Sequence, residues 1–216
     1  MILRPVLQMA AVAGLAAALS GCSLLSTPDP VQMYRFGLPL DAPSAEGAAP
    51  APLSVSVRRI EFPEATRDDR ILGVTGTETA YIGGARWVSP AATLFDDSLK
   101  AAFANRADRI RVLGRREPGT PPLVLQVSVT TFEARYSSPG AVPDVIVTAR
   151  AQLRSTPERQ AAGGAIRPEQ GRSVERVFTV TQPATENRVA AIVDAFDRAT
   201  RDINTQIADW TIQSAN

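Results

Sequence analysis

The only cysteine of the chain, Cys22, lies in a context where its thiol can accept a lipid. It ends Leu19-Ser20-Gly21-Cys22, after an apolar run over 6–19 that only Gln8 interrupts and that Arg4 precedes. This layout is typical of a secretory signal with small residues at the cleavage site. A cysteine directly after Ser-Gly is the pattern of a bacterial lipobox. We therefore expect residues 1–21 to be removed as a lipoprotein signal peptide and Cys22 to carry a diacylglyceryl group.

Two other interpretations of this segment are open: an ordinary signal peptide with a chance cysteine, and a short transmembrane anchor. The apolar run is about 14 residues, whereas a membrane-spanning helix needs about 20, so the anchor is disfavoured. Acyl chains contribute about 0.8 kcal/mol per buried methylene, and more than one chain holds a protein durably. Ser23 stands where an aspartate would favour inner-membrane retention. We expect a lipid-anchored protein of the cell envelope on the periplasmic face of the outer membrane.

No other residues are arranged for catalysis or metal binding. The sequence contains no histidine, which removes the commonest general base and the commonest metal ligand. Ser54, Ser56 and Ser128 therefore have no imidazole to activate them. Asp68-Asp69 and Asp96-Asp97 are adjacent pairs whose side chains point apart on a helix. We expect no catalytic residues, no metal and no cofactor beyond the lipid on Cys22, and hence a protein that is not an enzyme.

Charge and length restrict the partners further. Residues 22–216 number 195, enough for one domain with its own core, and loss of Arg4 leaves 22 basic against 22 acidic residues. A neutral chain lacks the basic field that nucleic acid requires. With Cys22 acylated, no thiol remains for a disulfide.

Periodicity predicts the elements that follow the anchor. Residues 22–52 are rich in Pro, Ala, Ser and Gly and are predicted to be a lipidated N-terminus, tether and linker; Tyr34 and Phe36 interrupt them as an edge strand or core contact. Residues 53–216 are predicted as the folded domain. Alternation predicts strands near 53–62, 70–74, 78–82, 109–113, 123–136, 145–153 and 174–181. Helical spacing predicts helices from Ser89-Pro90 to about 105 and over 187–211.

This order predicts an α+β domain, with a mostly antiparallel sheet and two amphipathic helices packed on one face. The second helix either packs across the sheet or binds a partner.

One segment carries a resemblance to a known family. Tyr81 and, after a short gap, Ala85-Arg86-Trp87-Val88-Ser89-Pro90 at the start of an amphipathic helix resemble the ABC-type transport auxiliary lipoprotein family, with Val88 in place of the usual alanine. The resemblance implies that 53–216 is the auxiliary lipoprotein domain and that the protein is a non-catalytic accessory. Its implied partners are an MCE-domain protein, an ABC permease and an ATPase that together move lipids between the two membranes. Self-assembly into a ring is implied as well, although the sequence neither shows nor excludes it.

Arg86 and Trp87 have two interpretations. Trp87 can fix the helix to the sheet, or Arg86 and Trp87 can form part of a partner contact, since both residue types are enriched at binding hot spots. Three other functions compete with the transport accessory: a lipid-carrying module, a structural envelope lipoprotein, and a hydrolase that uses Asp or Glu alone, which no carboxylate spacing supports.

Overall fold

The computed structural model describes residues 30–37, 53–114, 117, 121–155 and 171–215; Cys22 lies outside these residues. The described part contains two helices and one sheet of eight strands. In chain order the elements are β1 (Gln32–Tyr34), β2 (Leu53–Val57), β3 (Arg70–Thr75), β4 (Glu78–Trp87), α2 (Ala91–Ala104), β5 (Ile110–Val112), β6 (Leu123–Tyr136), β7 (Asp144–Ser155), β8 (Ser173–Pro183) and α3 (Val189–Ala215).

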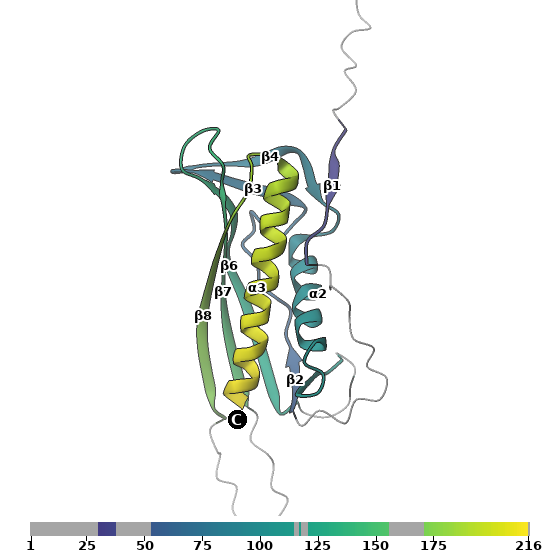
Figure 1. Ribbon diagram of the computed structural model, residues 1–216. Helices are drawn as coiled ribbons and strands as arrows, with labels where there is room; N and C mark the ends of the chain where they lie inside the picture. Colours follow the sequence, from purple (N-terminus) through teal and green to yellow (C-terminus); the bar gives the residue numbers. More distant parts are fainter. Residues whose placement is uncertain (1–29, 38–52, 115–116, 118–120, 156–170, 216) are drawn as a thin grey trace, which may run out of the picture. The chain divides into compact units, whose positions relative to one another are not determined.

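Strand β6 is the centre of the sheet (Figure 1). One edge of β6 pairs along most of its length with β7, which in turn pairs with β8. The other edge is shared by two strands: β2 pairs with its beginning and β3 with its end. Glu61 bridges to Ser128 between them. A single long strand therefore holds together the two halves of the sheet.

The sheet is mixed, which corrects the prediction of a mostly antiparallel one. Three strand pairs are antiparallel, β3–β4, β6–β7 and β7–β8. Four are parallel, β1–β4, β2–β5, β2–β6 and β3–β6. Alternation reveals which face of a strand is buried but carries no information on the direction of its neighbour. Parallel neighbours need long connections, and 58–122 supply one that includes α2.

The buried positions of β6 change once from odd-numbered to even-numbered residues, and a β-bulge is the reason. Odd-numbered residues from Leu123 to Val129 are buried, and after a register shift between Val129 and Thr131 the buried residues are Phe132 and Ala134. One extra residue reverses the parity of a strand. The bulge keeps apolar side chains on the core face along all of β6.

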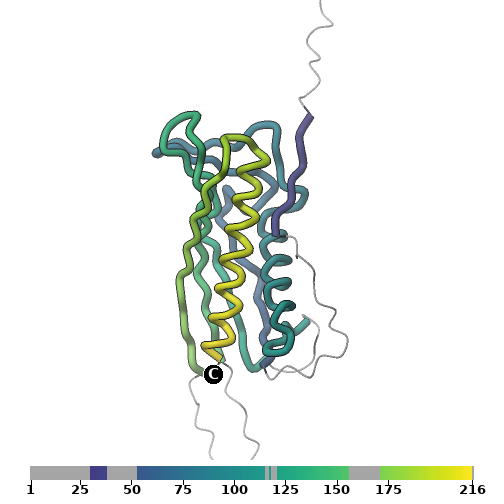
Figure 2. Tube along the Cα trace, viewed as in Figure 1, coloured from purple at the N-terminus to yellow at the C-terminus, as the bar shows by residue number. Residues whose placement is uncertain are grey.

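Both helices lie on the same face of the sheet, as predicted. Helix α3 packs on β7 and β8 and against α2, and α2 also contacts β5; Figure 2 shows the two helices side by side. Pro90 holds the N-cap position of α2, and no side chain caps the helix. The first amides of α2 instead donate to the carbonyl oxygens of Asp68 and Arg67, at 2.9 and 3.2 Å, which satisfies groups that a helix start leaves free.

The compact unit begins at Gln32, earlier than the predicted domain start at residue 53. β1 pairs with residues 85–87 of β4, and the Phe36 side chain is buried in the core. The edge strand and the core contact that the sequence predicts for Tyr34 and Phe36 are both present, within the segment predicted as tether and linker.

Candidate functional site

Arg86 and Trp87, the two candidate partner-binding residues, lie at the end of β4 and point to opposite faces of the sheet. Successive side chains of a strand alternate, and here the Trp87 side chain is 1% exposed while Arg86 is on the surface. Two backbone hydrogen bonds of 2.7 Å hold the end of β4 in place: Trp87 N–H donates to Asp69 O, and Val88 N–H donates to Tyr34 O. The two residues therefore serve different purposes.

Trp87 is a packing residue. Its ring lies edge-on to Phe36 and Phe196, with centroid distances of 4.8 and 5.4 Å, and tilted to Phe132 at 6.4 Å. These partners belong to the segment after β1, to β6 and to α3. The indole therefore packs the end of β4 against the central strand and the long helix. Each such aromatic pair contributes about 0.5–1.5 kcal/mol beyond area burial. The structure agrees with the first interpretation of Trp87, and no partner can reach the indole in this conformation.

The indole N–H of Trp87 has no hydrogen-bond acceptor among the described residues. A buried unsatisfied donor costs about 1–3 kcal/mol. The three ring contacts of Trp87, at about 0.5–1.5 kcal/mol each, are of a size that offsets this cost.

Arg86 is the residue of the pair that is accessible to a partner. Its guanidinium nitrogen Nη1 donates to both carboxylate oxygens of Asp69 at 3.0 Å. Next to it in the register, Arg70 holds its guanidinium 3.9 Å from the centroid of the Tyr81 ring. Exposed ion pairs contribute at most about 1 kcal/mol, so Arg86 remains free to exchange Asp69 for another anion.

Gly37 connects β1 to both helices. Its N–H donates to Asp197 Oδ1 of α3 at 2.7 Å, and Asp197 also pairs with Arg201. Gly37 has a φ of 71°, and a Cβ at this position would lie 2.6 Å from Ser98 Cβ of α2. Only glycine fits this close approach.

The described residues contain no group of three or more His, Cys, Asp or Glu side chains that could hold a metal ion. Hydrogen bonds are the main cause of the perturbed carboxyl pKa values. A hydrogen bond from Arg106 lowers the pKa of Asp209, a hydrogen bond from the Gly114 backbone lowers that of Glu117, and one from Arg188 lowers that of Glu186. Burial raises the pKa of Tyr136. None of these shifts brings a carboxyl group into the range of a general acid or base at neutral pH.

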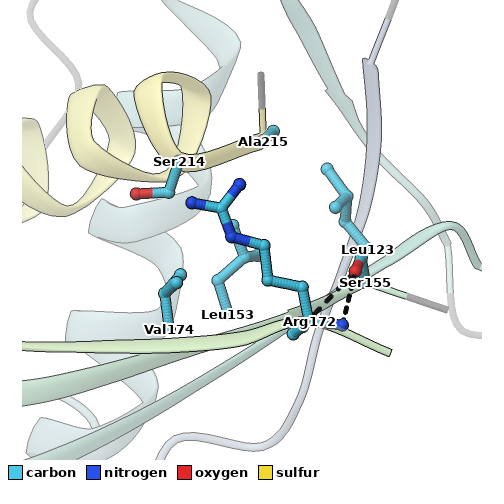
Figure 3. A pocket seen from close by; sticks show the side chains of 7 residues that line it. All are labelled: Leu123, Leu153, Ser155, Arg172, Val174, Ser214 and Ala215. Atoms are coloured by element: carbon cyan, nitrogen blue, oxygen red, sulfur yellow. Dashed lines mark hydrogen bonds between the residues drawn. The ribbon is translucent and has the colours of Figure 1, made fainter. Parts of the chain in front are cut away.

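A cavity of about 210 Å³ lies where β6, β7 and β8 meet the end of α3 (Figure 3). Its lining combines apolar and polar residues: Leu123, Leu153, Val174, Ala215, Ser155, Ser214 and Arg172. Arg172 N–H donates to Ser155 Oγ at 3.1 Å, and its guanidinium extends towards the end of α3. The volume is below the range of about 300–1,000 Å³ that is usual for ligand pockets, so the cavity gives little support to a lipid-carrying module.

Sequence reasoning missed the partners that position these residues. No local sequence pattern indicates the bonds of Asp69 to Arg86 and of Asp197 to Gly37, because each joins elements that are distant in sequence. The same holds for the Arg106–Asp209 pair, whose shortest N–O distance is 2.6 Å. Cys22 was predicted from a local motif and lies outside the described residues. No described helix has the length and apolar character needed to cross a membrane.

Comparison with known proteins finds one matching family model and solved structures with a similar fold. A family model described as "ABC-type transport auxiliary lipoprotein component" matches residues 34–208. The crystal structure of protein XCC0632 from Xanthomonas campestris is similar at a TM-score of 0.65 and 23% identity, covering 85% of this chain and 96% of that one. A second crystal structure, of an uncharacterized protein, has a TM-score of 0.62 at 15% identity and covers 84% and 98% of the two chains. No curated protein matches.

Proposed function

We propose that this chain, which belongs to the family of ABC-type transport auxiliary lipoprotein components, is the outer-membrane-anchored, non-catalytic accessory of an intermembrane lipid transport system. The observation that carries the proposal is the family match over residues 34–208. The lipobox at Leu19–Cys22 supports it from outside the matched region. Cys22 would hold the protein at the periplasmic face of the outer membrane.

In this role the folded unit docks the periplasmic substrate-binding assembly, an MCE-domain protein, whose permease and ATPase lie in the inner membrane. The energy of transport comes from that ATPase, and this chain supplies position and contact. Several copies side by side would give a ring, for which the edge strands β8 and β1 offer unpaired backbone groups. A structural envelope lipoprotein is the second candidate, and it differs by having no transporter among its partners.

The test is affinity purification of the tagged protein from crosslinked, detergent-solubilised envelope, followed by mass spectrometry. Recovery of an MCE-domain protein with its permease and ATPase is the expected result. The control is Cys22→Ala, which we expect to move the protein from the membrane fraction to the periplasm and to reduce this recovery. Recovery of the chain alone, or with wall-linked proteins only, would favour the structural role.

A further inference from the structure

We propose that one face of the folded unit lies against the phosphate headgroups of the membrane that carries the lipid anchor. We call this surface the β1–β4 face, and its residues are Met33, Arg35, Arg70, Tyr81, Arg86 and Val88. The inference rests on the proposed lipid attachment at Cys22 and goes beyond it, because an anchor alone does not determine which face of a protein meets the bilayer.

Alternation along two neighbouring chain segments creates this face. Phe36 and Trp87 point into the core, so Arg35, Arg86 and Val88 point away from it. The Met33 side chain is 55% exposed and Val88 is 43% exposed. Two large apolar side chains are therefore in solvent beside the best-packed part of the core.

The residues of the β1–β4 face are contiguous across three strands. Met33 and Arg86 are register partners in β1 and β4, and Arg86 and Arg70 are register partners in β4 and β3. Arg70 covers the ring of Tyr81. Val88 follows directly, because its N–H continues the ladder to Tyr34 O. Apolar side chains and arginines thus share one surface.

The charge of this surface suits an anionic headgroup. Arg86 is paired with Asp69, whereas Arg35 and Arg70 have no carboxylate partner among the described residues. Arginine keeps its charge at the water side while its stem lies along apolar groups. Each arginine near an anionic membrane surface strengthens the attraction roughly fivefold. Methionine, valine and tyrosine on the same surface as the guanidinium groups of Arg35 and Arg70 make a composition that is typical of a membrane interface.

The distance to the anchor selects a membrane as the occupant. Nine residues lie between Cys22 and Gln32, the first residue of β1, and the ten steps from one to the other span at most about 36 Å in an extended chain. The β1–β4 face is therefore tethered close to the bilayer. A tether turns a weak contact into an intramolecular one with a high effective concentration, so a few side chains are enough to orient the protein.

The experiment uses the full-length lipidated chain with one introduced cysteine. Since Cys22 is the only natural cysteine and is acylated, a new thiol is the only site for an environment-sensitive fluorophore. The variants are Met33→Cys and Val88→Cys. The matched control is Val177→Cys on β8: Val177 is 54% exposed, and β7, β6, β3 and β4 separate β8 from β1 in the sheet.

On vesicles of phosphatidylethanolamine and phosphatidylglycerol, we expect labels at positions 33 and 88 to shift to shorter wavelength and to lose quenching by iodide. The label at position 177 is expected to stay aqueous. Phosphatidylcholine vesicles are expected to weaken the response, and Arg35→Gln with Arg70→Gln to reduce the contacting population roughly fivefold per arginine.

Three results would overturn the inference. If the chain floats with vesicles but all three labels behave alike, the anchor stands and the oriented face is wrong. If labels 33 and 88 become protected only when the partner assembly is added, the β1–β4 face is a protein contact. If the lipidated preparation does not float at all, the membrane anchoring in the proposed function fails, and the inference fails with it.

Discussion

Replacing Gly37 with alanine tests how closely β1 approaches helix α2. Gly37 has a φ of 71°, and an added Cβ would lie 2.6 Å from Ser98 Cβ and 2.9 Å from Ser98 Oγ. A left-handed backbone costs a non-glycine residue about 1–2 kcal/mol. Forcing extra atoms into a packed core costs about 1–3 kcal/mol more. The Gly37→Ala variant is therefore expected to lose about 2–5 kcal/mol of the free energy of unfolding.

Gly76 provides the matched control. Its φ is 58°, but nothing lies within 4 Å of an added Cβ, so Gly76→Ala carries the backbone cost alone, about 1–2 kcal/mol. Removing the opposing Cβ with Ser98→Gly should relieve part of the Gly37→Ala loss. In a double-mutant cycle this relief corresponds to about 0.5–3 kcal/mol of coupling between the two positions.

The assay is urea unfolding of residues 22–216 with Cys22→Ser, which removes the need for detergent. It can follow fluorescence because Trp87 and Trp210 are both buried. Equal destabilisation by Gly37→Ala and Gly76→Ala, with no coupling to Ser98, would refute the close approach of β1 to α2.

Two further predictions concern the motif and the pH dependence. Trp87→Ala should cost about 3–5 kcal/mol in the same unfolding assay, whereas Arg86→Ala should cost less than about 1 kcal/mol; similar losses for both would contradict the division between core and surface. Asp209, whose pKa the hydrogen bond from Arg106 lowers, should stabilise the fold above the unfolded-state pKa of about 3.9, and this contribution should be lost as the pH falls through the lower folded-state pKa. Because the Asp209 side chain is 42% exposed, we expect Asp209→Asn to cost no more than about 1 kcal/mol at neutral pH and to match the unmodified chain in strong acid; a gap that widens in acid would have the wrong sign.

The elements themselves could be read from the sequence because each carries a local period. The alternation of Leu123, Leu125, Val127 and Val129 identified β6, and the apolar stripe from Val189 to Trp210 identified α3. Alternation likewise predicts strands at 123–136, 145–153 and 174–181, which correspond to β6, β7 and β8, three consecutive antiparallel strands. These features depend on residues close in sequence, whose geometry local chemistry determines.

Features that depend on distant pairing could not be read in this way. The parallel neighbours of β6 come from residues 55–57 and 73–75, and no local pattern indicates which strand lies beside which. The roles of the two site residues depend on distant pairing as well. A motif identified Arg86 and Trp87, but the role of Arg86 depends on its contact with Asp69. The role of Trp87 depends on its contacts with Phe36 and Phe196. The family resemblance therefore identified the important segment, and the fold was needed to divide it into a packing residue and a surface residue.

The shared edge of β6 has a consequence for the order in which the chain can fold. β2 and β3 are made before β6 and do not pair with each other, so the two parts of the sheet that contain them are joined only when residues 123–136 are present. The hairpin β3–β4 and the β6–β7–β8 meander consist of contacts close in sequence and can form early, whereas contacts at long separation in sequence form slowly. Closure of the sheet onto β6 is thus the late step. Until it occurs, β6 keeps one edge unpaired, which makes the folding chain most prone to aggregation before its sheet is complete.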